Sequence, residues 1–180
     1  MTDAASPFAE MLTGGHPNSL GRTVEVVEAA LAEPDRLDAL FACYQSDDPV
    51  VRLRASNALK RIEKAAPDLM IPYIDRLLTE VAAVDQPSAR WTVAQLFGRM
   101  AKAMTPAQRR EAEALLKRNL EEEPDWIVQN TTMDTLAGWA KSDEALRTWL
   151  LLRLAERQTD ERKSVAARAR KHHAALTAKA

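Results

Sequence analysis

Apolar residues recur at intervals of three and four along most of the chain. Val51, Ala55, Ala58 and Ile62 show this spacing in one segment, and several other segments repeat it. Such a period places apolar side chains on one face of an α-helix, and no segment has a convincing strand pattern. We therefore predict an all-α protein. The helices are expected near residues 20–32, 35–45, 49–65, 68–84, 87–103, 106–122, 125–140, 143–157 and 162–177.

Prolines at regular intervals indicate where these helices begin. They stand at positions 34, 49, 67, 87, 106 and 124. Proline suits the first helical position because its missing N–H would have no partner there and its φ is already helical. Asp48 before Pro49 is a favourable N-cap, and Thr105 with Gln108 has the spacing of a capping box. Pro72 should kink the start of its helix or delay it by a turn.

The helices repeat as pairs. One shift along the chain aligns the segment around Val51 with that around Ala89, and a second shift of nearly the same length reaches Val128. The same shifts match Ala55, Val93 and Thr132; Leu59, Phe97 and Leu136; and Ile62, Met100 and Trp139. The alternate helices align at Leu40, Leu77, Leu115 and Trp149. The repeat is thus about 38 residues long, within the range of ~20–50 residues that indicates an array of repeats.

The segment from Asp48 to Leu59 resembles the second helix of a HEAT repeat, in which Asp, then Val-Arg, precede spaced small and apolar residues. Gln86 replaces the Asp in the second repeat, Gln129 replaces the Arg in the third, and the fourth, near Val165, has neither. The resemblance covers roughly residues 35–178. It implies a right-handed alpha-alpha superhelix, a HEAT-like solenoid of about four helix pairs plus an N-terminal capping helix. It also implies that Arg52 and Arg90 reach an acidic cap or a carbonyl of a neighbouring repeat.

In such an array stacked helix pairs share one continuous core, and polar caps close its ends. The helices near 20–32 and 162–177 are the expected caps. We expect residues 1–18 to form a flexible tail and residues 19–180 a single repeat domain. A tetratricopeptide array is the nearest alternative, but its period of ~34 residues is too short and its Trp, Gly and Tyr spacing is absent.

Composition agrees with one helix-rich globular domain. The chain has 180 residues, of which 46% are hydrophobic and 28% charged, and this length buries a substantial core without disulfides or metals. The single Cys43 excludes an internal disulfide and a cysteine-based zinc site, and favours a reducing compartment. Neither a leader segment nor an apolar run of the ~20 residues that span a bilayer is apparent. We expect a cytoplasmic protein without membrane association.

Charge is distributed unevenly, although the net charge is only −1. Residues 1–50 carry two basic and nine acidic side chains, whereas residues 151–180 carry eight basic and three acidic ones. Such asymmetry can mark an electrostatic partner. The composition of two end caps explains it more simply.

Residues that could support catalysis are not arranged for it. The sequence contains no nucleotide-binding glycine loop, nucleophile elbow or zinc-protease pattern. We therefore expect no enzymatic activity, no metal, no cofactor and no small-molecule substrate. His172 and His173 fall at core-facing places of the last helix, where fraying is a simpler interpretation than metal binding. Trp91 lies away from the apolar stripe, so it is either packed against the next repeat or exposed for binding.

A mainly basic ridge remains on the second helices, which line the concave, partner-binding side in HEAT-like arrays. With Trp91 added, the candidate partner-binding residues are Arg54, Asn57, Arg61, Lys64, Trp91, Gln95, Arg99, Lys102, Lys141, Arg168 and Lys171. Asp134 interrupts the ridge. It would suit an acidic protein segment, or nucleic-acid phosphates contacted without base readout. Basic side chains that only solvate a helical face are the simpler alternative.

Two functions fit these observations. The first is a non-enzymatic scaffold or adaptor that binds a protein partner, with an acidic segment favoured, and it rests on fold-level analogy. The second is nucleic-acid binding, including a likeness to HEAT-like alkylpurine DNA glycosylases, for which Asp134 and Trp91 are the only candidates. A pI near 6.3 argues against tight DNA binding. Lyase-like HEAT proteins that act on tetrapyrroles form a third class, for which no residue can be nominated.

Overall fold

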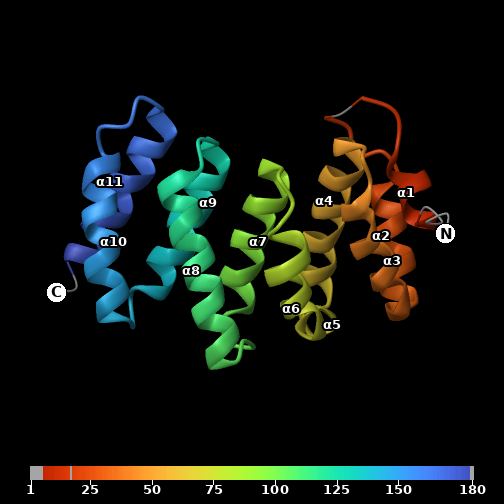
Figure 1. Cartoon of the computed structure of the whole chain (residues 1–180), viewed down its shortest axis with the longest axis horizontal. Helices are drawn as coiled ribbons and strands as arrows, with labels where there is room; N and C mark the ends of the chain where they lie inside the picture. The colour runs from red at the N-terminus through yellow and green to blue at the C-terminus, as the bar shows by residue number, and fades with distance from the viewer. Residues whose placement is uncertain (1–5, 17, 179–180) are drawn as a thin grey trace. The chain divides into compact units, whose positions relative to one another are not determined.

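A computed structural model of the chain describes residues 6–16 and 18–178. All regular structure in these two ranges is helical, which confirms the predicted all-α class. The chain divides into two compact units, one ending at Val93 and the other beginning at Ala94, so that helix α7 contributes to both. Figure 1 colours the helices from red at the N-terminus to blue at the C-terminus. None of the described helices has the length and apolar character needed to cross a membrane.

The first unit is organised around helix α4. Its helices are α1 (Pro7–Leu12), α2 (Thr23–Ala32), α3 (Leu37–Ala42), α4 (Pro49–Ala65), α5 (Pro67–Met70), α6 (Ile74–Arg76) and the first half of α7 (Pro87–Met100). Helices α1, α2, α3 and α5 all contact α4. The α4 residues Ala55, Leu59 and Ile62, which the apolar pattern assigned to the core, are fully buried.

The segment predicted as a helix over residues 68–84 is interrupted where Pro72 stands. A 3-10 turn (Ile71–Tyr73) contains the proline, α6 follows for one turn, and a π-helical turn (Leu77–Val81) ends the segment. Proline has no N–H for a helical hydrogen bond, and its ring clashes with the carbonyl of the preceding turn. The predicted disturbance of the helix is therefore confirmed.

The second unit holds the rest of α7 and four longer helices. These are α8 (Pro106–Glu122), α9 (Trp126–Trp139), α10 (Glu144–Arg157) and α11 (Lys163–Thr177). Helix α9 contacts α8, α10 and α11, and α10 contacts α11. The predicted capping box of α8 is present, because Gln108 N donates to Thr105 Oγ1 at 3.2 Å and Thr105 N donates to Gln108 Oε1 at 2.9 Å.

Side chains in each unit bond to residues about one repeat away. In the first unit Arg76 Nη1 lies 2.7 Å from Asp38 Oδ1, and Gln86 Nε2 donates to the Pro49 carbonyl at 3.0 Å. In the second unit Arg162 donates to the Pro124 carbonyl. These partners are 38, 37 and 38 residues apart. The separations agree with the repeat length found in the sequence.

Arg52 bonds within its own repeat and to the cap position of the next. Its Nη1 donates to the Ser46 carbonyl at 2.5 Å, and its Nε donates to Gln86 Oε1 at 2.7 Å. Gln86 stands where the resemblance expects the capping Asp of the next repeat. The Ser46 carbonyl lies in the same repeat as Arg52, and the neighbouring cap position offers an amide in place of the acidic group that the resemblance implies.

The N-terminal segment differs from the prediction. Residues 1–18 were expected to be a flexible tail, but residues 7–12 form α1, and its Phe8 and Leu12 are fully buried. Helix α1 contacts α2, α3 and α4. The predicted domain start at residue 19 is therefore wrong, because two large apolar side chains before it belong to the core. Residues 1–5 and Pro17 lie outside the described residues.

Arg54 secures the segment that follows α1. Its Nη1 donates to the carbonyls of Leu12 at 2.6 Å and Gly14 at 2.7 Å, and its Nη2 donates to the His16 carbonyl at 3.1 Å. Its Nε and Nη2 also reach the carbonyl and hydroxyl of Ser19. All five guanidinium N–H groups thus have acceptors. Because Arg54 is only 1% exposed, its predicted role in partner binding is wrong.

Candidate binding pocket on helices α7 and α9

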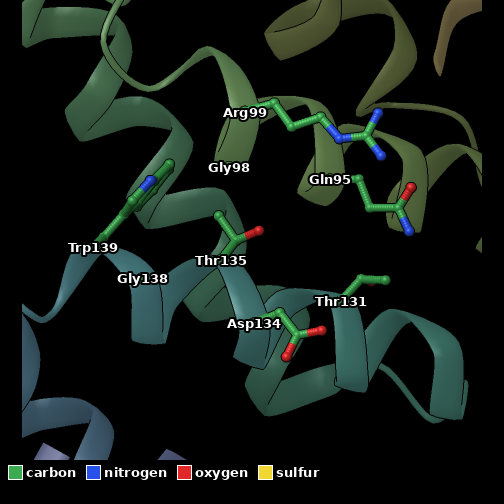
Figure 2. Close-up of a pocket in the computed structure, with 8 residues that line it drawn as sticks. All are labelled: Gln95, Gly98, Arg99, Thr131, Asp134, Thr135, Gly138 and Trp139. Atoms are coloured by element: carbon green, nitrogen blue, oxygen red, sulfur yellow. The ribbon is translucent and has the colours of Figure 1, made fainter. Parts of the chain in front are cut away.

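An open pocket of about 440 Å³ lies between α9 and the part of α7 that belongs to the second unit. Its lining residues are Gln95, Gly98, Arg99, Thr131, Asp134, Thr135, Gly138 and Trp139. Figure 2 shows Gln95 and Arg99 extending from α7, with Thr131 and Asp134 on α9 across from them. The pocket therefore brings together side chains about one repeat length apart in the sequence.

Gly98 permits the close approach of the two helices. A Cβ atom at this position would lie 2.8 Å from Thr135 Oγ1, closer than such atoms can approach without a shift. Thr135 Oγ1 is itself fixed, because it donates to the Ala94 carbonyl on α7 at 2.7 Å. A glycine on one helix and a hydrogen-bonded threonine on the other thus set the spacing of the pocket walls.

Gly138 leaves the pocket open. In the repeat alignment it takes the place that Arg61 holds in the first repeat and Arg99 in the second. A Cβ atom on Gly138 would meet no other atom within 4 Å. The third repeat thus has open space at the position where the two earlier repeats carry arginine.

Asp134 connects the pocket to α11. Its Oδ1 lies 2.6 Å from His172 Nε2, and its Oδ2 accepts a hydrogen bond of 2.6 Å from Arg168 Nη1. Burial alone would raise the pKa of Asp134, but the hydrogen bonds from His172 and Arg168 outweigh it and lower the pKa. A carboxylate held in this way stays charged at neutral pH, and the guanidinium of Arg168 compensates its charge.

Sequence spacing contained a signal for this contact that the prediction missed. Gln95, Asp134 and His172 follow one another at intervals of one repeat length. Residues in one column of consecutive repeats are neighbours in a stacked array. The interpretation of His172 as part of a frayed cap is replaced by a half-buried side chain bonded to Asp134.

Trp139 forms the apolar end of the pocket. It is 7% exposed, as its predicted core register requires. The guanidinium of Arg109 lies over its ring, with Cζ 3.2 Å from the centroid. Its indole Nε1 is buried and has no hydrogen-bond partner among the described residues. Trp139 thus offers apolar surface next to the polar groups of α7 and α9.

The predicted binding residues fall into separate groups. Gln95 and Arg99 line the pocket, and Arg168 lies beside it through Asp134. Lys102, Lys141 and Lys171 are exposed in the second unit but do not line the pocket. In the first unit the exposed residues are Arg61 and Lys64, the half-buried ones are Asn57 and Trp91, and the buried one is Arg54. Arg168 is paired with Asp134, which reduces the positive charge predicted for the ridge.

The Asp134 contacts predict a difference in acid stability between the protein and Asp134→Asn. Because the pKa of Asp134 is lowered by folding, its charged form stabilises the fold above the unfolded value of ~4, and this contribution disappears as pH falls below about 4. The effect should be modest, since the side chain is 42% exposed. The thermal unfolding temperature, measured from about pH 3 to 7, should decrease less steeply towards acid pH for Asp134→Asn than for the wild-type protein. If the unfolding temperatures of the two proteins change with pH in parallel, the pKa of Asp134 is not lowered by folding.

The chemistry of the pocket is thus one of hydrogen bonding and charge. Its α7 wall carries an amide and a guanidinium, and its α9 wall carries a carboxylate with two partners. Residues 6–16 and 18–178 contain no group of three or more His, Cys, Asp or Glu side chains that could hold a metal ion. Comparisons with protein-family models, with curated proteins and with solved structures give no match for this chain.

Proposed function

We propose that the protein is a non-enzymatic interaction scaffold, a solenoid of HEAT-like helix pairs, that binds a segment of a protein partner in the pocket on α7 and α9. The observation that carries this proposal is an open pocket of about 440 Å³ on the two helices assigned to the binding side. Ligand sites on proteins are concave and carry a small number of precisely placed polar groups.

An acidic partner segment fits the charges of this pocket. Arg99 and Gln95 are one turn apart on α7 and present guanidinium and amide N–H groups on the same wall. The negative charge of Asp134 is compensated by Arg168, so it repels an incoming carboxylate less than a lone aspartate would. A carboxylate that reaches Arg99 gains a charge-assisted hydrogen bond.

The bonding of the pocket hydroxyls supports a binding role over catalysis. Thr131 Oγ1 donates to the Ile127 carbonyl at 2.7 Å, and Thr135 Oγ1 donates to the Ala94 carbonyl. A hydroxyl nucleophile needs a base that accepts its proton, and both of these protons are directed at main-chain oxygens. The repeat-length contacts, such as that between Arg162 and Pro124, support the solenoid.

Filling the pocket should abolish partner binding. Gly138→Phe places a ring where a Cβ atom meets nothing within 4 Å, so it should occupy the cavity without displacing the core. We expect a partner captured by the wild-type protein from native extract to be lost from Gly138→Phe and reduced at least tenfold with Arg99→Glu. Quantitative mass spectrometry of the captured proteins measures both effects.

Ala145→Phe is the matched control, because it adds the same ring at an exposed position of α10 outside the pocket. It should retain the partner. Equal partner sets for wild type and Gly138→Phe would refute the choice of pocket.

Nucleic-acid binding is the second candidate, favoured by the exposed cations Arg61 and Lys64 on α4 and Lys102 after α7. The pairing of Arg168 with Asp134 and the burial of Arg54 weigh against it. Binding of generic duplex DNA that falls steeply with salt and is lost in Arg61→Glu/Arg99→Glu would favour this candidate. Absence of binding at low salt would eliminate it.

A further inference from the structure

Helix α2 has an acidic outer face. Its exposed residues include Val24, Glu25, Glu28 and Ala32. The last three follow Val24 by one, four and eight positions, and this spacing places all four on one side of the helix. The opposite side is buried, and α2 contacts α4. Val24 is 46% exposed, so an apolar side chain lies beside the two carboxylates. Glu25 is paired with Arg22, whose Nη2 lies 2.8 Å from its carboxylate, so Glu28 supplies the uncompensated negative charge of this face, next to the apolar surface of Val24.

Helix α11 has a basic outer face. The exposed residues on it are Lys163, Ala167, Arg170, Lys171 and Ala174. No acidic residue occurs between Lys163 and Thr177. The other side of α11 is buried and contacts α9 and α10. Short alanine side chains between the bases allow another helix to approach closely.

We propose that copies of this chain associate head to tail, with the basic outer face of α11 of one copy docked on the acidic outer face of α2 of the next. The chain itself supplies both complementary faces, and apolar and small side chains accompany the charges on each. The uneven charge of the sequence, with nine acidic side chains in residues 1–50 and eight basic ones in residues 151–180, then has a structural purpose. None of these residues lines the pocket on α7 and α9.

The association should be weak and sensitive to salt. One helix docked on another buries less than the ~1,200 Å² of a stable interface, and exposed charges are screened beyond about 10 Å at 0.1 M salt. A contact between two different faces leaves both faces free at the ends of the assembly, so it continues into longer chains unless it closes into a ring. The mean mass should therefore rise with concentration past that of a dimer.

Sedimentation equilibrium of the full chain tests this association. The protein concentration is varied from about 20 µM to 1 mM, once at about 20 mM NaCl and once at about 500 mM NaCl. We expect mean mass to rise at low salt and to approach the monomer at high salt. Glu25→Lys/Glu28→Lys and, separately, Lys163→Glu/Lys171→Glu should each weaken association at least tenfold. In each variant two faces of the same charge would have to meet.

Mixing the two variants supplies the decisive observation, because opposite faces are then available again on different molecules. Association should return in the mixture. Glu111→Lys/Glu122→Lys and Lys64→Glu/Lys141→Glu are controls that change net charge equally at exposed positions away from these faces. Circular dichroism checks that all variants remain helical. A monomeric wild type at low salt, equal weakening by the controls, or no recovery in the mixture would each overturn the proposal.

Discussion

Arg54→Met is expected to lower the free energy of unfolding by about 3 kcal/mol or more, which is the largest effect that we predict for an exchange of one side chain. Methionine fills part of the volume but donates no hydrogen bond. The carbonyls of Leu12, Gly14 and His16 would lose the guanidinium that now binds them. Loss of these bonds should also release the buried Phe8, since α1 is connected to the domain through this segment.

Urea unfolding measures the loss, and limited proteolysis between α1 and α2 shows where it acts. Arg61→Met is the matched control, because Arg61 lies on the same helix and is exposed; it should change stability by no more than about 0.5 kcal/mol. Arg54→Lys should recover only part of the stability, as lysine has three donors in place of five. If Arg54→Met and Arg61→Met unfold at the same urea concentration, Arg54 does not anchor the segment.

Arg54 also illustrates why the sequence prediction failed at the N-terminus. The residue lies three positions after Val51 and four before Ala58, so helical spacing places it at the edge of the buried stripe. Its positive charge suggested solvent exposure instead. Its burial depends on carbonyls far earlier in the chain, such as that of Gly14, in a segment with no apolar period. A local pattern carries no information about such partners.

The helices were predictable because their signals are local. Asp48 and Thr105 cap the helices that the sequence assigned to them, as hydrogen bonds from the following N–H groups show. The buried stripe follows the repeat register, with Leu59 and Leu136 both fully buried. These features depend only on neighbouring residues and on helical geometry, so periodicity and capping rules are sufficient to predict them from the sequence.

The pocket was only half predictable, because it depends on an absent side chain. Gln95 and Arg99 were selected as polar residues beside the stripe, and both line the pocket. Gly138 was passed over, although the repeat alignment places it in the column of Arg61 and Arg99. Glycine has no side chain whose chemistry could mark it as part of a binding site. Comparison of each column across the repeats, including its glycines, would have found it.

Alanine at the two pocket glycines should have effects of opposite sign. Gly98→Ala is expected to lower the free energy of unfolding by about 1–3 kcal/mol, because its Cβ atom would lie 2.8 Å from the Thr135 hydroxyl. The added Cβ atom can be accommodated in two ways. Either the Thr135 side chain moves and loses its hydrogen bond to the Ala94 carbonyl, or α7 and α9 move apart. Gly138→Ala should instead stabilise by roughly 0.5 kcal/mol, since alanine restricts the unfolded chain and meets nothing in the fold.

The pair forms its own control, because both glycines are exposed, lie near the C-terminal ends of their helices and are changed to the same residue. Urea unfolding of both variants should move the midpoints in opposite directions. The sign at Gly138 also decides how the loss of a partner in Gly138→Phe is to be interpreted. If Gly138→Ala destabilises the protein, the space at Gly138 is filled and the pocket is closed. If it stabilises, and Gly138→Phe unfolds at a urea concentration no lower than the wild type does, a partner lost from Gly138→Phe was excluded by occupation of the pocket and not by damage to α9.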